Sequence, residues 1–270
     1  MTDPRRFTPS SPRIAYYRAG ESGPAVLLVM GYGMRGAAWE PQVDTLRRDH
    51  RLCYYDHLGV GESDDAPGPI TMKTMARDAL RVMDAAGFER AHLVGVSMGG
   101  MIAQELALHC PERFDTLTLV ATHAGGLRSM LPTPRGLSYF ARAQVGAPRE
   151  RVKALTGLLY PESYVASIDK ATLEARMRGT VGVRAKRRTL LYQLRAIALH
   201  DARARLGAIT LPTLVVRPGL DVLIHPSHSD ELHRRIPGST LVRIDDAGHG
   251  CLFQSAETLA DVLRSHFRGG

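Results

Sequence analysis

The chain has 270 residues, of which 44% are hydrophobic and 23% are charged, so it is not intrinsically disordered and can form the core of one large domain. Its three cysteines, Cys53, Cys110 and Cys251, are an odd number at scattered spacings, which argues against a disulfide framework and a metal site and fits a reducing compartment. The formal net charge is +8, the first residues include no apolar targeting segment and no long apolar run occurs, so we expect a cytoplasmic protein without stable membrane insertion.

The first part of the chain alternates between short apolar runs and helical patterns of apolar residues. The predicted elements are a strand at 13–18, a buried strand at 25–30, a helix at 39–48, a strand at 51–56 and a helix at 71–86. Gly87 is placed to end the last of these helices. Glycine-rich loops at 31–33 and 57–63 each follow a predicted strand.

The next stretch places a serine between a strand and a helix. Apolar residues up to Val96 predict a buried strand, and apolar residues after Gly99 recur at helical spacing. Ser97 therefore lies on a sharp turn, where glycines at 95 and 99 let the helix pass close to the strand. Its hydroxyl is expected to stand clear of the turn, with the Met98 N–H beside it. The alternative is a glycine-rich turn whose serine only caps the helix.

After a strand at 116–120, the alternation stops, and residues 125–205 contain successive helical stretches broken by proline and glycine. This segment carries 16 Lys and Arg against 5 Asp and Glu, a net charge of +11, whereas the rest of the chain has 19 against 22. No nucleic-acid-binding motif accompanies the excess, so we expect no nucleic-acid partner. The charge run at 184–188 is either a solvated face, a bias towards anionic substrates, or a surface for an acidic partner or membrane.

The alternation resumes near the C-terminus. The predicted elements are a strand at 213–216, a helix at 227–236, a strand at 240–244 and a helix at 255–267 with Ser255 as its N-cap. Alternating strands and helices imply a mostly parallel sheet flanked by helices, the α/β class. We therefore expect an α/β core formed by 1–124 and 206–270, with 125–205 inserted as a helical lid over the ends of the sheet.

A serine becomes a nucleophile when a base takes its proton and a third group orients that base. His249 lies in a Gly-His-Gly loop directly after a predicted strand, so its ring can reach the same sheet edge as Ser97. Asp221 follows the strand at 213–216 and is the nearest candidate for the orienting acid, although a loop aspartate can also form a local Asx turn. Cys251 is a rival nucleophile by position, but it lacks an elbow of its own, and packing is the simpler role.

Stabilising a developing oxyanion takes two converging N–H groups. Met98 supplies one at the start of its helix. Tyr32 can supply the other, because Gly31 and Gly33 on either side let the loop fold over the elbow. The alternative for this loop is an ordinary strand-ending turn.

These motifs together resemble the α/β-hydrolase superfamily over nearly the whole chain. Besides the elbow, they include Gly31-Tyr32-Gly33, Asp56 with the glycine-rich loop after it, Pro111-Glu112-Arg113 and Gly248-His249. The resemblance is nearest to the branch of 3-oxoadipate enol-lactonases, small-molecule esterases and cofactor-free perhydrolases. It implies the triad order Ser97, Asp221, His249.

The implied activity is that of a carboxylesterase-like serine hydrolase without cofactor or metal, cleaving a small ester, lactone or thioester through an acyl-enzyme. Two alternatives stay open. One is a perhydrolase or carbon–carbon bond hydrolase with the same triad, and the other is a sensor of a small ligand on the same fold.

Three positions depart from the pattern of many relatives. Met30 replaces a histidine whose side chain steadies the oxyanion loop, and Leu58 replaces an arginine in the following glycine-rich loop. Asp221 lies one residue earlier than the acid usually does between its flanking glycine and proline. These departures raise the question of how both loops are held and whether Asp221 can reach His249.

Overall fold

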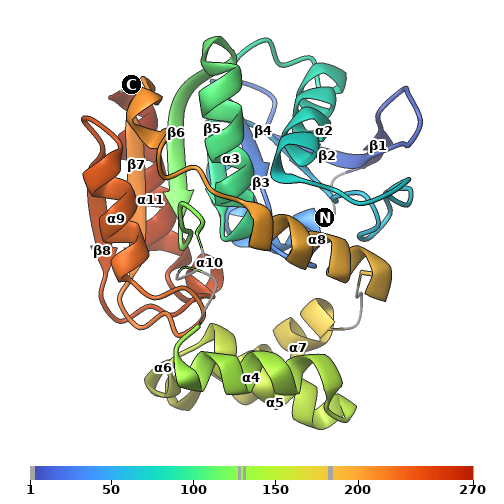
Figure 1. Ribbon diagram of the computed structural model, residues 1–270, viewed down its shortest axis with the longest axis vertical. Helices are drawn as coiled ribbons and strands as arrows, with labels where there is room; N and C mark the ends of the chain where they lie inside the picture. Colours follow the sequence, from blue (N-terminus) through green and yellow to red (C-terminus); the bar gives the residue numbers. More distant parts are fainter. Residues whose placement is uncertain (1–3, 127–128, 130–131, 182–184, 270) are drawn as a thin grey trace.

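The computed structural model describes residues 4–126, 129, 132–181 and 185–269 and contains an eight-stranded sheet (Figure 1). The order across the sheet is β1-β2-β4-β3-β5-β6-β7-β8. The strands are β1 (Arg5–Phe7), β2 (Ala15–Ala19), β3 (Ala25–Val29), β4 (Arg51–Tyr55), β5 (Ala91–Val96), β6 (Phe114–Val120), β7 (Thr213–Pro218) and β8 (Thr240–Ile244). Strands β3 to β8 pair in parallel, which confirms the expected α/β class with a mostly parallel sheet.

The antiparallel pairs lie at one edge, where β1 pairs with β2 and β2 with β4. Strand β1 was not expected, because its three residues are Arg-Arg-Phe and carry no alternation or apolar run. Its place at the edge explains this composition, since no strand of the described residues pairs with its outer side and its own residues are largely exposed.

Helices cover both faces of the sheet and enclose two apolar cores. They are α1 (Glu40–Leu46), α2 (Met72–Ala85), α3 (Met98–His109), α9 (Ser227–Arg235), α10 (Cys251–Gln254) and α11 (Ala256–Arg268). One core packs α2, α3 and α9 on the sheet through side chains such as Met83, Met101 and Leu232. The other packs α1 and α11 through Leu46 and Leu263 on the opposite face. Strands buried on both sides explain the continuous apolar runs of β3 and β5.

The ends of two helices can be compared with the capping residues predicted from the sequence. Thr71 and Thr74 cap α2 reciprocally, and Gly87, with a φ of 72°, follows its end as predicted. Ser255 is the N-cap residue of α11, but its side chain accepts no hydrogen bond from the first turn. The short helix α10 ends immediately before it, and the Ser255 N–H donates to the Cys251 carbonyl, so the chain does not enter α11 from an extended conformation.

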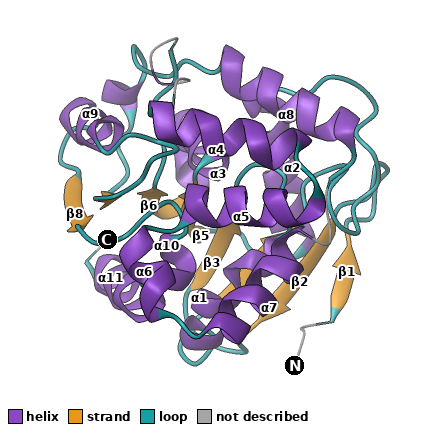
Figure 2. Cartoon of the chain, turned by 90° about the horizontal axis from the view of Figure 1, so that it is seen from below, coloured by secondary structure: helices purple, strands orange, loops and turns teal. Residues whose placement is uncertain are grey.

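Further helices lie between β6 and β7, and we call α4 to α8 the inserted helices. They are α4 (Pro134–Val145), α5 (Pro148–Leu159), α6 (Glu162–Ser167), α7 (Lys170–Val181) and α8 (Arg187–Leu199). Figure 1 shows α4 to α7 as a separate layer below the sheet, and the view from below in Figure 2 places α4 and α5 in front of the strands. None of the helices in the described ranges is long and apolar enough to cross a membrane.

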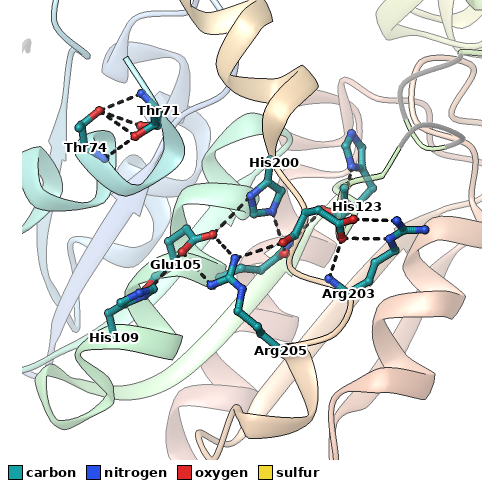
Figure 3. Close-up of polar contacts among 11 residues, drawn as sticks. Thr71, Thr74, Glu105, His109, His123, His200, Arg203 and Arg205 are labelled. Carbon is teal, nitrogen blue, oxygen red and sulfur yellow. Dashed lines mark hydrogen bonds and ion pairs between the residues drawn. The ribbon is translucent and has the colours of Figure 1, made fainter. Parts of the chain in front are cut away.

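A polar cluster joins α3 to the chain segment that follows α8. We call Gln104, Glu105, His123, His200 and Arg205 the anchor cluster; all but the partly exposed Arg205 are buried. Figure 3 shows how Glu105, His200 and Arg205 lie in it. Arg205 donates two hydrogen bonds to the Glu105 carboxylate, at 2.5 and 3.0 Å. His200 contacts Gln104 at 3.2 Å, and the amide nitrogen of Gln104 donates to the His123 carbonyl at 3.0 Å. Because α3 begins beside Ser97, this cluster connects the inserted helices to the helix of the elbow.

Candidate active site

Ser97 has a backbone conformation that residues other than glycine rarely adopt. Ser97 lies between the end of β5 and the start of α3 and has a φ of 55° and a ψ of −124°. Hydrogen bonds to both main-chain groups of Ser97 hold this conformation. The Ser97 N–H donates to the Val120 carbonyl at 2.9 Å, and the Ser97 carbonyl accepts from Thr122 Oγ1 at 2.7 Å and from the Gly100 N–H at 2.9 Å. Strain held in this way is common at functional sites, and it matches the expected sharp turn.

Close packing explains why glycines flank this serine. A Cβ at Gly95 would lie 2.4 Å from the Gly99 oxygen, and a Cβ at Gly99 would lie 2.1 Å from the Val29 oxygen. Both contacts are with main-chain atoms, which cannot move aside cheaply. Helix α3 therefore passes against β5 and β3 at a distance that only glycine allows, as the sequence pattern indicated.

Asp221 and His249 lie side by side despite the displaced position of the acid. His249 Nδ1 is 2.7 Å from Asp221 Oδ2, and the two residues are 8% and 3% exposed. Asp221 Oδ1 accepts the N–H groups of Leu223 and Ile224 at 2.8 and 2.9 Å. Because the carboxylate can only accept, Nδ1 donates and Nε2 is left as the basic nitrogen. Asp221 therefore forms the Asx turn with one carboxylate oxygen and contacts His249 with the other.

The glycines on either side of His249 contact the inserted helices. The Gly250 N–H donates to the Leu159 carbonyl at 2.8 Å, and a Cβ at Gly248 would lie 2.6 Å from the same oxygen. Tyr160 would collide with a Cβ at Gly250. The end of α5 thus packs directly on the histidine loop, a contact that the sequence did not predict.

Ser97 and His249 line one cavity of about 160 Å³ between the sheet and the inserted helices. Tyr32 lines it as well, so the structure brings the predicted nucleophile, base and oxyanion loop to one place. Most of the wall is apolar and comes from Met30, Met34, Ala38, Val96, Phe140, Ala143, Leu155, Leu158, Leu159, Leu190, Leu223, Leu252 and Phe253. A cavity of this size and lining suits a small, largely apolar molecule.

The loop that carries Tyr32 packs directly on the elbow. A Cβ at Gly31 would lie 3.1 Å from Ser97 Cβ, so a side chain there would crowd the serine. Met98 is the first residue of α3, so its N–H has no intrahelical acceptor. The two N–H groups predicted for an oxyanion hole thus belong to segments that border Ser97.

Two residues that the sequence did not single out hold this loop. Gln193 of α8, which is fully buried, accepts the Gly33 N–H on its Oε1 at 2.8 Å. His57 Nε2 donates to the Met30 carbonyl at 2.8 Å, and burial lowers the pKa of His57 and favours its neutral form. Together they replace the side-chain contact that a histidine at position 30 would make. No sequence signal distinguished Gln193 from any other polar residue on a helix.

The glycine-rich loop at 57–63 is held from Asp56 instead of from position 58. Asp56 Oδ1 accepts the Gly36 N–H at 2.8 Å, and Oδ2 accepts the Glu62 N–H at 3.0 Å. Ser63 Oγ donates to the Asp56 carbonyl at 2.6 Å. Leu58 is buried, so the position that carries arginine in many relatives contributes to the apolar core here.

The rival nucleophile Cys251 is unsuited to the role. It is fully buried, and burial raises the pKa of its thiol to about 12, so the thiolate is not populated near neutral pH. Cys251 belongs to the apolar core formed with α11, as the packing interpretation expected.

Comparison with known proteins agrees with this architecture. The family model of the alpha/beta hydrolase fold matches residues 24–256. A protein of Azorhizobium caulinodans named "Putative carbamate hydrolase RutD" is 34% identical over 251 residues, which cover 92% of each chain.

Two solved structures superpose over almost the whole chain. A thermophilic esterase from Thermogutta terrifontis has a TM-score of 0.80 and 25% identity, with 98% of both chains covered. An enol-lactonase from Burkholderia xenovorans LB400 has a TM-score of 0.84 over 98% of this chain and 100% of that chain, and at 24% identity the likeness concerns the fold. The resemblance expected from the motifs is confirmed, and the chain belongs to the alpha/beta hydrolase family.

Proposed function

We propose that this hydrolase cleaves a small carboxylic ester, lactone or thioester through an acyl-enzyme on Ser97. The observation that carries the proposal is the meeting in one cavity of a strained serine and a histidine paired with a buried aspartate at 2.7 Å. Each group has a role that its surroundings favour, and all come from the carboxyl ends of strands β5, β7 and β8 or the loops after them.

In the first half of the reaction, Ser97 Oγ attacks the substrate carbonyl carbon while His249 Nε2 takes the hydroxyl proton. Asp221 keeps the proton of His249 on Nδ1 and stabilises the imidazolium that forms. The N–H groups of Tyr32 and Met98 hold the negative oxygen of the tetrahedral intermediate. The carbon–oxygen or carbon–sulfur bond then breaks, and the leaving group receives the proton from His249.

In the second half, water attacks the acyl-enzyme with His249 again as base, and Ser97 leaves with its proton restored. The apolar wall of the cavity limits the water present beside the acyl group. We take residues 125–205 to be the lid of this cavity, because α4, α5 and α8 contribute Phe140, Leu155 and Leu190 to its lining.

Carbamate hydrolysis is a second candidate, favoured by the name of the relative from Azorhizobium caulinodans. A carbamate carbonyl is attacked in the same way, with nitrogen or oxygen as the leaving atom. The same triad would also serve perhydrolysis or cleavage of a carbon–carbon bond. These reactions differ in their products and not in the residues that we propose.

The experiment combines active-site labelling with product identification. A fluorophosphonate probe should add one adduct to the intact protein at Ser97, and Ser97→Ala should abolish labelling and lower turnover by about a millionfold, while the protein stays folded. Ser63→Ala is the matched control, since that hydroxyl bonds main-chain groups outside the cavity.

A panel of small esters, lactones, thioesters, carbamates, peracids and diketones then identifies the reaction from its products. Hydrolysis confined to carbamates would replace the ester assignment. Labelling at Ser63 or Cys251 would overturn the assignment of the nucleophile, and stoichiometric labelling without turnover of any panel member would favour a ligand sensor.

A further inference from the structure

Among the described residues, a single permanent cation lines the catalytic cavity, and one of its buried N–H groups has no acceptor. Arg151, on α5, is the only residue with a permanent charge among the described residues that line it. Its Nε is buried and, within the described part of the chain, has no hydrogen-bond partner. A buried N–H of a charged group that lacks an acceptor is costly, so an acceptor from outside the chain would be strongly favoured there.

Three cations in and next to the inserted helices have carboxylate partners. Arg135 pairs with Glu162, Lys186 with Asp65 at 2.7 Å and Arg205 with Glu105. For Arg151 the described residues provide no ion pair. Arg151 therefore makes no ion pair of the kind by which Lys186 and Arg205 join this segment to the core.

Arg151 also lies at a junction between two cavities. It lines the catalytic cavity and an adjoining, more open cavity that is bounded by Gln144, Arg187 and Leu190. Among the described residues that line these two cavities, none is a carboxylate. A cleft with positive charge and no negative charge concentrates anions at its mouth.

We propose that Arg151 binds a carboxylate of the substrate, at the end away from the carbonyl that Ser97 attacks. The guanidinium offers parallel donors that match a carboxylate, and the apolar wall contacts the spacer between the two ends. A carboxylate fits better than a phosphate, because Arg151 is the sole permanent cation among the described residues of a chamber of about 160 Å³. The inference rests on the proposed hydrolase function and names its substrate class.

This inference separates one arginine from the general positive charge of 125–205. Arg142 and Arg149 are exposed and do not line the catalytic cavity. Arg188 lies over the ring of Tyr192 at 6.0 Å, and position 184 of the charge run lies outside the described residues. Exposed charges of this kind are screened by salt, whereas a contact inside the cavity is screened much less.

The test compares two esters of equal shape, p-nitrophenyl hydrogen glutarate and p-nitrophenyl 5-methylhexanoate, whose isopropyl end replaces the carboxylate. The readout is the ratio of their kcat/KM values, corrected for spontaneous hydrolysis. Arg151→Gln should lower this ratio by about tenfold to a hundredfold, mainly through KM of the glutarate ester. Arg151→Lys should give an intermediate ratio, because it keeps the charge and loses the paired donors.

Arg149→Gln is the matched control, since it removes an exposed charge two positions away on the same helix. It should leave the ratio within about twofold at moderate salt. Thermal unfolding of each variant checks that the fold is kept. A ratio unaffected by Arg151→Gln, or lowered equally by Arg149→Gln, would overturn the assignment of Arg151.

A binding measurement keeps this test separate from the test of the hydrolase function. Glutarate binding is followed by isothermal titration calorimetry with wild-type protein, Arg151→Gln and Arg149→Gln. If wild-type protein hydrolyses neither ester and no ester, lactone or thioester of the panel, but Arg151→Gln weakens glutarate binding about tenfold or more, the proposed reaction is wrong and the carboxylate site stands. Equal dissociation constants for wild-type protein and Arg151→Gln would reject the carboxylate site, whatever the enzyme hydrolyses.

Discussion

Acidification should loosen the anchor cluster through its buried histidines. The His200 side chain is 1% exposed and lies between Gln104 and Glu105. Burial, with a smaller contribution from the nearby Arg205, lowers the pKa of His200 to about 4 against the opposing effect of Glu105. Burial likewise lowers the pKa of His123 to about 3. Both histidines are therefore neutral in the folded protein at neutral pH.

The direction of the effect follows from proton binding. In the unfolded chain His200 takes up a proton near pH 6.5, whereas in the folded chain it does so only near pH 4. Between these values the unfolded state binds more protons, so stability falls as the pH falls through this window. One pH unit of difference in pKa corresponds to about 1.4 kcal/mol, so acidification from about pH 7.5 to about pH 5 costs about 2 kcal/mol at His200 alone.

The assay is urea unfolding across this pH range for wild-type protein and His200→Gln. Glutamine keeps a donor for Gln104 and does not titrate, so the variant should lose about 2 kcal/mol less than wild-type protein between the two ends. His109→Gln is the control, because that side chain lies on α3 next to the cluster and is 50% exposed. Glu105, whose pKa is raised by burial but lowered overall by Arg205, titrates below this range.

The comparison refutes the reasoning if His200→Gln loses as much stability on acidification as wild-type protein does. The reasoning is also refuted if the stability of wild-type protein does not change between about pH 7.5 and about pH 5. Other buried histidines with lowered pKa values, such as His92 and His123, should add to the loss of stability on acidification.

Three further expectations concern the candidate site. Asp221→Asn should lower kcat about ten-thousandfold with little change in KM, because an amide favours the wrong imidazole tautomer. Steady-state kinetics measures this, with Asp246→Asn as an active control. The reverse result would move the role to Asp246. Gly99→Ala places a methyl group 2.1 Å from a main-chain oxygen of β3, so thermal unfolding should show a loss of about 3 kcal/mol or no folded protein, and wild-type stability would contradict the close packing. Gln193→Leu leaves the Gly33 N–H without its acceptor and should lower kcat about tenfold, more than it changes KM, whereas unaltered kcat would show that the oxyanion loop is held without Gln193.

The fold could be predicted from local patterns because they are fixed by short-range chemistry. The continuous apolar run at 25–30 became β3, buried on both faces, and the helix predicted at 71–86 became α2 with Thr71 as its cap. Periodicity reports which side of an element faces the core, so it identifies strands and helices without knowledge of their partners. The turn at Ser97 was predictable for the same reason, since glycines at fixed spacing indicate a close backbone approach.

Placement at the ends of parallel strands also explains why Ser97, Asp221 and His249 could be named as a group. Their roles remain predictions. Whether the acid reached the histidine was a matter of tertiary structure, because one residue of displacement changes the direction of a side chain. The loop after β7 turns so that Leu223 and Ile224 hold one oxygen of Asp221 and leave the other for His249.

Contacts between distant segments were decided only in the folded chain. Gln193 supports a loop 160 positions earlier, and nothing in the sequence around it signals that contact. Arg151 was one of 16 basic residues in its segment, and only the packing of α5 over the sheet distinguished it as the cation that lines the cavity. Composition and periodicity determine which elements form and which faces are buried, whereas the partner of a particular polar group depends on how those elements pack in three dimensions.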